Sequence, residues 1–298
     1  MIDWKRLIDL TSKVEKLPLF LAPAILMIGF LFSSFRWQNL LDSLKVRQKI
    51  KALYKYYLIG LFYSIFLPGV IGGDIIRIGI CAKETKSSIG LITTSALIER
   101  ICGVIILFVI GSLLIFTLPS NVLLALGKPM TKVFPIFTCL LLFLLVVVYA
   151  IFRKFHFKWL FENNKNGLLK KLIQVMNLVI RLPYSTLLHL FIFSALFQAS
   201  DIIASFAIAK ALNISVSLTL FFAIMPIVYI STILPVSLGG LGVREGTFVY
   251  FLSKVGVLSS DAVALSFLIY FNRILIGSIG GILQIFRPKN NIDNASQP

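Results

Sequence analysis

Long apolar runs alternate with short basic segments along this chain. A run of about 20 apolar residues is long enough for an α-helix to cross the hydrocarbon core of a bilayer. The strands of a membrane β-barrel alternate apolar and polar residues, and these continuous runs do not. We therefore predict an all-α polytopic integral membrane protein. The runs that predict its apolar helices are 17–35, 56–73, 89–118, 133–152, 184–209, 211–243, 246–257 and 262–286.

The composition agrees with this class of protein. Of the 298 residues, 58% are hydrophobic and 14% are charged, and the mean hydropathy is +0.94. Soluble domains carry about a quarter charged residues, so we expect no soluble domain here. The net charge of +17 comes from basic residues between the apolar runs. There they set topology and attract anionic lipid headgroups rather than nucleic acid.

No residue pattern points to a cofactor. Cys81, Cys102 and Cys139 are isolated, and His156 and His189 lie far apart, so the spacing of a metal site or a disulfide framework is missing. The nucleotide-binding pattern Gly-x-x-x-x-Gly-Lys-Ser/Thr is missing too. We expect no cofactor, no metal and no catalytic residues, and any transport should be downhill or ion-coupled.

The most informative feature of the chain is a pattern that occurs twice. Leu-Pro-x-x-x-Gly-Gly-x-x-x-Arg runs from Leu67 to Arg77 and again from Leu234 to Arg244 (234 − 67 = 167 positions apart). Each copy ends an apolar run with helix-breaking residues and an arginine, which need partners that lipid cannot supply. A duplicated, interrupted apolar element indicates the binding site of a transporter built from two repeats. Each half is therefore predicted to contain a broken or re-entrant Pro/Gly-Gly helix.

The basic segments predict how the two halves are oriented. Segments 36–55 and 153–181 are the two most basic loops, so both are expected on the cytoplasmic side. Both can lie there only if 56–73 enters the membrane and returns, which makes the halves inverted repeats. The transmembrane domain is predicted at 17–286, with an interfacial segment at 1–16 and a polar tail at 287–298. Its halves are about 17–152 and 184–286, joined by a basic amphipathic linker at 153–183.

The two copies of the pattern supply most of the candidate binding residues. Glycine lets the backbone unwind and approach a ligand, and free amides at a helix start beside an arginine suit a phosphate. Alternatively, these residues only pack helices closely, and the arginines extend to the membrane interface. The substrate-binding candidates from the copies are Pro68, Gly72, Gly73, Asp74, Arg77, Pro235, Gly239, Gly240, Arg244 and Glu245.

A second arginine lies deep in a long apolar run of each half. Glu99-Arg100 occupies the first run and Asn272-Arg273 the second, and we add Glu99, Arg100 and Arg273 to the candidates. A charge at the membrane centre costs about 2.5–3.5 kcal/mol on insertion scales, so it needs a reason to be there. Glu99 and Arg100 point about 100° apart on a helix, so each is expected to pair elsewhere, across the repeat axis. Ligand binding and an ion-pair network that locks the halves together are compatible explanations.

Two further groups of polar residues lie in or beside the apolar runs. The acids Asp74, Asp201 and Glu245 could neutralise the arginines, bind a cationic headgroup or relay protons, and one sequence does not separate these roles. Arg36-Trp37 follows the first apolar run directly and is interpreted as an anchor at the membrane interface.

These residues make the chain similar to the flippase-like membrane domain of the lysylphosphatidylglycerol synthase transmembrane family. The resemblance covers about residues 18–286, and it implies handling of a phospholipid or polyprenyl-linked lipid in a bacterial or archaeal cytoplasmic membrane. The longer relatives add a soluble domain that transfers an aminoacyl group from charged tRNA, and without it we expect no synthase activity. The matching features are Arg36-Trp37, Phe66-Leu67-Pro68-Gly69, Gly72-Gly73-Asp74, Arg77, Glu99-Arg100, Gly103, Pro235, Gly239-Gly240, Gly242-Val243-Arg244-Glu245-Gly246 and Arg273.

Three functions are compatible with the sequence. The first is a lipid flippase or translocator for an anionic or lipid-linked headgroup, with Arg77, Arg100, Arg244 and Arg273 binding phosphate. The second is a non-catalytic membrane partner of an enzyme of lipid or cell-surface polysaccharide synthesis. The third is a membrane-embedded transferase, which would need a general base such as Asp74, Glu99 or Glu245. We favour the first, and we place the third last because no nucleophile–base arrangement is recognisable.

Overall fold

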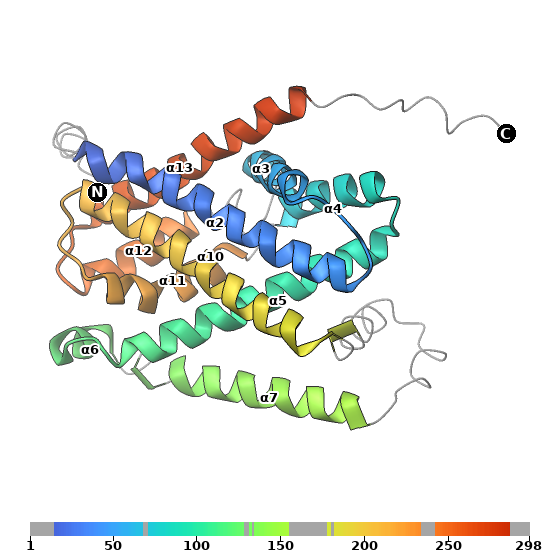
Figure 1. Cartoon of the computed structure of the whole chain (residues 1–298). Helices are drawn as coiled ribbons and strands as arrows, with labels where there is room; N and C mark the ends of the chain where they lie inside the picture. The colour runs from blue at the N-terminus through green and yellow to red at the C-terminus, as the bar shows by residue number, and fades with distance from the viewer. Residues whose placement is uncertain are drawn as a thin grey trace.

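The computed structural model describes residues 15–67, 71–127, 131–132, 134–154, 178–179, 182–233 and 242–286. Its secondary structure in these ranges is helical, with ten α-helices and no strand (Figure 1). This confirms the predicted all-α class. The helices are α2 (Lys16–Ser43), α3 (Ile50–Phe66), α4 (Ile71–Thr85), α5 (Ile89–Ile115), α6 (Ser120–Leu126), α7 (Phe134–Lys154), α10 (Tyr184–Ala211), α11 (Leu218–Ile233), α12 (Val243–Ser253) and α13 (Ser259–Ile285).

Four of the described helices, α2, α5, α10 and α13, are long and apolar enough to cross a membrane. The segments 1–14, 155–177 and 287–298 lie outside the described residues. The interfacial segment, most of the amphipathic linker and the polar tail therefore stay predictions.

The first helices of the two halves, α2 and α10, pack side by side and run antiparallel (Figure 1). The Glu15 amide donates to the Ala211 carbonyl at 2.9 Å near one end, and the Phe35 and Phe193 rings stack at 5.7 Å towards the other. The C-terminal end of α2 and the start of α10 consequently lie at the same end of the molecule. This is the relative orientation that the basic loops predicted.

Helices α3 and α4 form an antiparallel pair around two glycines. Gly73 lies against the backbone of Gly60 and the side chain of Ser64, so a Cβ atom at Gly73 would collide with the Gly60 carbonyl. Gly72 and Gly73 are helical residues in the first turn of α4, whereas the sequence suggested that they unwind. The first glycine pair thus packs two helices closely. Pro68, Pro235, Gly239 and Gly240 lie outside the described residues.

Glycines also allow close packing between the two halves, of α13 on α3 and of α5 on α11. A Cβ atom at Gly280 of α13 would collide with the Leu58 carbonyl of α3, and one at Gly111 of α5 would lie 2.7 Å from the Pro226 ring of α11. Pro226 lies inside α11 and does not end it. The helix continues from Leu218 to Ile233 through the proline.

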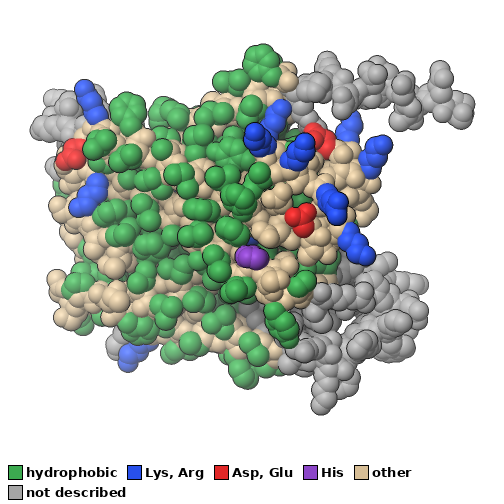
Figure 2. Space-filling view, in the orientation of Figure 1, with side chains coloured by type: hydrophobic (Ala, Val, Ile, Leu, Met, Phe, Trp, Pro, Cys, Tyr) green, Lys and Arg blue, Asp and Glu red, His purple; other side chains and the backbone are tan. Residues whose placement is uncertain are grey.

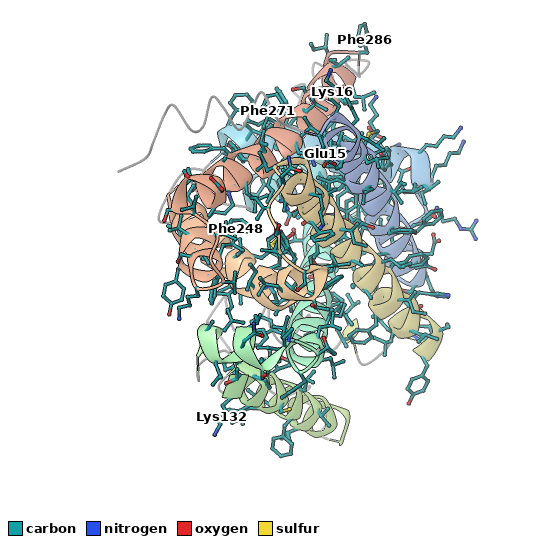
Figure 3. The ribbon with its side chains drawn as sticks, turned by 90° about the vertical axis from the view of Figure 1, so that its left-hand side faces the viewer. Glu15, Lys16, Lys132, Phe248, Phe271 and Phe286 are labelled. Atoms are coloured by element: carbon teal, nitrogen blue, oxygen red, sulfur yellow. The ribbon has the colours of Figure 1, made fainter. Side chains whose placement is uncertain are left out.

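The outer surface has a broad apolar region and a basic end (Figure 2). Apolar side chains cover much of the face in Figure 2, and Lys and Arg gather at the end where α2 stops and α3 begins. Phe271 and Phe286 lie on the outside, 57% and 78% exposed, whereas Phe248 is buried between helices (Figure 3). Helices α6 and α7 lie to one side of the bundle (Figure 1), and α7 contacts α5 through a 2.7 Å Ser112–Thr138 hydrogen bond.

Candidate functional site

A buried carboxylate, Glu99 of α5, is the centre of the first group of charges. Its side chain is 0% exposed. The Arg36 guanidinium of α2 donates to Oε1 at 2.6 Å, and Arg77 of α4 donates to Oε2 at 3.0 Å. The Tyr57 hydroxyl of α3 also donates to Oε1. Four helices therefore meet at one carboxylate.

Arg36 is not the interfacial anchor that the sequence suggested. It is 6% exposed and Trp37 is 0% exposed, because α2 continues for two turns beyond the apolar run and carries both residues into the bundle. Its Nη1 donates to Ser194 of α10 at 2.9 Å, while the Trp37 indole donates to Ser95 of α5 at 3.0 Å. A buried arginine with several partners stabilises the junction between helices instead of marking the membrane surface.

The charges extend from Glu99 as an alternating series, Arg36–Glu99–Arg77–Asp74–Arg100, which we call the Glu99 network. Arg77 donates to Asp74 at 2.8 Å, and its guanidinium lies 4.5 Å from the Trp37 ring and 4.3 Å from the Tyr57 ring. Two rings and two carboxylates therefore fix Arg77, which is 3% exposed.

Glu99 and Arg100 each pair elsewhere, as expected, and their ion pairs among the described residues lie within one half of the chain. Glu99 pairs with Arg36 and Arg77, and Arg100 pairs with Asp74. All of these residues belong to the first half. Asp74 lies one helical turn before Arg77, so its carboxylate can pair with Arg77 and with Arg100, which belong to the same half.

The second half has its own arginine at the start of α12. Arg244 donates to Ser266 of α13 at 2.8 Å through Nε and to Glu245 at 2.8 Å through Nη2. Glu245 in turn accepts from the Ser266 hydroxyl at 2.9 Å and from the Gly242 amide at 2.5 Å. The amide expected to be free for a phosphate at this helix start is therefore capped by a carboxylate.

The deep arginine of α13 pairs with an acid of α10. One oxygen of Asp201, Oδ2, accepts from Nη2 of Arg273 at 2.7 Å and from the Tyr229 hydroxyl of α11 at 2.6 Å. Asp201 is 4% exposed, whereas the Arg273 side chain is 31% exposed. This buried acid thus holds an arginine that stays accessible.

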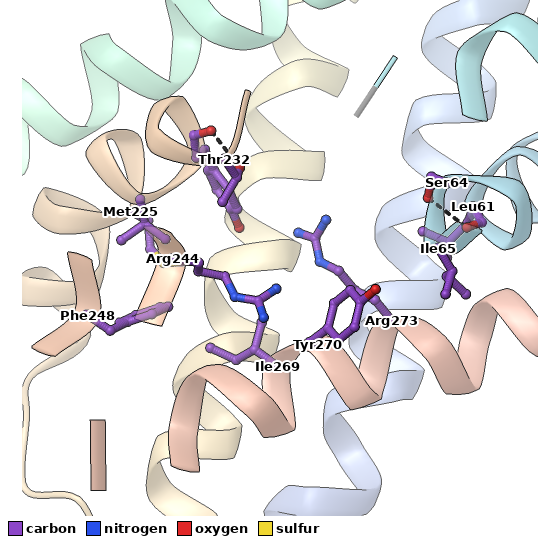
Figure 4. Close-up of a pocket in the computed structure, with 12 residues that line it drawn as sticks. Leu61, Ser64, Ile65, Met225, Thr232, Arg244, Phe248, Ile269, Tyr270 and Arg273 are labelled. Carbon is purple, nitrogen blue, oxygen red and sulfur yellow. Dashed lines mark hydrogen bonds between the residues drawn. The ribbon is translucent and has the colours of Figure 1, made fainter. Parts of the chain in front are cut away.

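Arg244 and Arg273 meet at a pocket between α3 and the helices α11, α12 and α13. The pocket has a cavity volume of about 80 Å³ and opens to the surroundings. In Figure 4 both guanidinium groups extend into the gap between α3 on one side and α11 and α12 on the other. The Tyr270 ring lies 4.9 Å from the Arg244 guanidinium. The other lining residues are mostly apolar: Leu61, Ser64, Ile65, Met225, Val228, Tyr229, Thr232, Phe248 and Ile269.

The structure thus divides the predicted site residues into two groups. It brings Arg244 and Arg273 to the pocket, with Glu245 bonded to Arg244, whereas Asp74, Arg77, Glu99 and Arg100 form the separate Glu99 network. Sequence reasoning missed Tyr57 and Tyr229, which bond the buried acids. Their signal was weak, because a tyrosine in an apolar helix is common at membrane interfaces. Within the described residues, no cluster of three metal-binding side chains occurs.

This arrangement is that of a polytopic helical membrane protein with buried ion pairs and an arginine-lined pocket. A family model described as the lysylphosphatidylglycerol synthase TM region matches residues 1–281. The chain therefore belongs to this family, and the resemblance noted in its motifs is confirmed. A search of curated proteins found no match to this chain.

Proposed function

We propose that this protein moves a lipid with an anionic headgroup between the leaflets of the cytoplasmic membrane, and that the pocket holds the headgroup. The observation that carries the proposal is the convergence of Arg244 and Arg273 on one largely apolar pocket. Each arginine is paired with one acid, and an anion that enters the pocket can accept hydrogen bonds from both guanidinium groups. A phosphodiester offers the oxygen acceptors that two planar arginines bind.

The remaining pocket lining suits the rest of a lipid. Leu61 and Ile65 of α3 face Met225 and Val228 of α11 across the pocket. These side chains can contact glycerol and the first acyl carbons, which have no polar groups for a protein to satisfy. A headgroup bound at the arginines would therefore leave its acyl chains on apolar surface.

The helix contacts support a relation between the halves as inverted repeats. Helix α3 packs on α13 as α11 packs on α5, and the pairs α3–α4 and α4–α5 correspond to α11–α12 and α12–α13. The antiparallel packing of α2 and α10 gives the two halves opposite directions. Transporters with inverted repeats place substrate at the repeat interface and expose it to either side by rocking one repeat against the other. We assign this role to the pocket between α3 and α11–α13.

Lipid movement in proteoliposomes tests the proposal. Headgroup-labelled phosphatidylglycerol, phosphatidylcholine and a polyprenyl-phosphate sugar would be compared for wild type, Arg244→Ala and Arg273→Ala at matched reconstitution. A hydrogen bond to a charged group contributes about 1.5–3 kcal/mol, so each variant should slow movement of the anionic lipid roughly 10- to 100-fold. Arg47→Ala removes an exposed loop arginine and should leave the rate unchanged.

The other functions predict different results. A non-catalytic partner of a lipid or glycan enzyme would move no lipid in wild type. A structural role for both arginines would lower protein recovery and stability in the two variants, with the rate per folded molecule unchanged. A transferase would produce a chemically altered lipid, which mass spectrometry of the same vesicles detects.

A further inference from the structure

The pocket contains an acid whose charge depends on what its arginine binds. Asp201 and Arg273 share one hydrogen bond at 2.7 Å, and Arg273 lines the pocket while Asp201 lies behind it, 4% exposed. An anionic headgroup that takes Arg273 competes with Asp201 for the same guanidinium group. Asp201 would then be a buried carboxylate without its ion-pair partner, which is costly unless the carboxylate is protonated.

The charges around the pocket lead to the same conclusion. Arg244 and Arg273 are balanced by Glu245 and Asp201 (2 − 2 = 0). A headgroup with one negative charge leaves the site at −1 in apolar surroundings. One proton from water restores neutrality.

Asp201 is better suited than Glu245 to receive this proton. Glu245 accepts from the Gly242 amide, the Ser266 hydroxyl and Arg244, and a backbone amide at a helix start keeps stabilising its charge. Among the described residues, Asp201 accepts hydrogen bonds from two side chains, Tyr229 and Arg273, and both line the pocket. Its stabilisation therefore changes when the pocket fills.

The groups that face Asp201 from neighbouring helices do not replace the lost partner. Tyr229 comes from α11 and Arg273 from α13. The facing stretch of α2, within 17–35, has no charged residue. On α5, Glu99 is held by Arg36 and Arg77, and Arg100 by Asp74; Cys102 is a buried, free thiol. Arg244 and Glu245, across the pocket, are bonded to each other.

We infer that the pocket binds an anionic headgroup together with one proton, and that Asp201 carries the proton. In this step the proton adds to Asp201 as the Arg273–Asp201 ion pair opens, and Arg273 turns its donors to the headgroup. Release of the headgroup restores the ion pair and returns the proton to water. The inference rests on the proposed function, and it makes lipid movement sensitive to a proton gradient.

The test is calorimetric titration of the full chain in detergent with dihexanoyl phosphatidylglycerol, whose phosphodiester keeps one negative charge over the neutral range. Titrations in two buffers of different ionisation enthalpy give the number of protons taken up. We expect about one proton taken up per bound lipid, and an affinity that falls as the pH rises because the bound protein carries one more proton than the empty one. Dihexanoyl phosphatidylcholine, which is zwitterionic, should take up no proton.

Asp201→Asn should bind the anionic lipid without proton uptake and without the loss of affinity at higher pH. Asp42→Asn, at an exposed carboxylate, should behave as the wild type. Wild-type binding without proton uptake at any pH from 5 to 8 overturns the inference alone, and this result does not depend on the folding of any variant. Proton uptake that persists in Asp201→Asn also overturns it. Absence of any binding to wild type overturns the inference and the proposed function together.

Discussion

Arg36 and Glu99 are 63 positions apart in the sequence, yet Nη2 of the arginine lies 2.6 Å from Oε1 of the glutamate. The pair joins α2 to α5, and through Arg77 and Tyr57 the same carboxylate also holds α4 and α3. Its four helices belong to the first half of the chain. The Glu99 network therefore holds these four helices of the first half together.

We expect Glu99→Gln to destabilise the protein strongly. The amide cannot balance Arg36 and Arg77, which are 6% and 3% exposed. Removing one partner of a buried ion pair costs about 3–5 kcal/mol. Thermal unfolding in detergent should show a large fall in melting temperature. Asp42→Asn neutralises an exposed carboxylate and serves as the control. Equal melting temperatures for Glu99→Gln and this control would show that the network is dispensable.

The packing of α13 on α3 depends on the missing side chain of Gly280. A Cβ atom there would collide with the Leu58 carbonyl, which belongs to the backbone and cannot turn aside. We expect Gly280→Ala to destabilise the fold by about 1–3 kcal/mol, the usual cost of overpacking.

Gly79→Ala is the matched control for that substitution. It is also a helical glycine, and a Cβ atom at Gly79 has nothing within 4 Å, so its melting temperature should stay at or above that of the wild type. Equal stability of the two variants would contradict the described contact.

Disulfide formation can check the antiparallel packing of α2 and α10. A Cβ atom at Gly29 would lie 3.0 Å from the Ser200 Cβ atom, close to the range of about 3.5–4.5 Å that disulfides require. In a background with the native cysteines replaced, we expect Gly29→Cys with Ser200→Cys to cross-link under mild oxidation. Leu21→Cys with Ser200→Cys, about two turns away along α2, should not. The opposite pattern would refute this alignment.

The sequence predicts the helices well, because long apolar runs have few other stable forms in a membrane. It predicts partners poorly. Arg36 follows an uncharged run, as an interfacial anchor does, and only the continuation of α2 to Ser43 shows that it is buried. Gly72-Gly73 has the composition of a broken helix, yet the same missing side chains allow α4 to approach α3. In both cases the deciding information is a contact with residues distant in sequence.

The candidate site shows the same limit. The repeated pattern identified Arg244 as a candidate, and the position of Arg273 deep in an apolar run identified the second arginine. The structure brings both to one pocket. The same logic grouped Arg77 with them, but Trp37 and Tyr57 enclose Arg77 in the first half. Matching positions in two halves need not perform matching tasks, because the neighbours of each arginine differ.

The proposed function depends most on the pocket being the path of the lipid headgroup. Ser64 of α3 lines the pocket (Figure 4), so a bulky maleimide on Ser64→Cys, in a background without native cysteines, should fill it. The measurement is the rate at which labelled phosphatidylglycerol changes leaflet in proteoliposomes before and after this modification. Gly79→Cys, on α4 and outside the pocket lining, is the control. We predict a large fall in rate for the modified Ser64→Cys protein alone, and an unchanged rate at full labelling would contradict the proposed path of the headgroup.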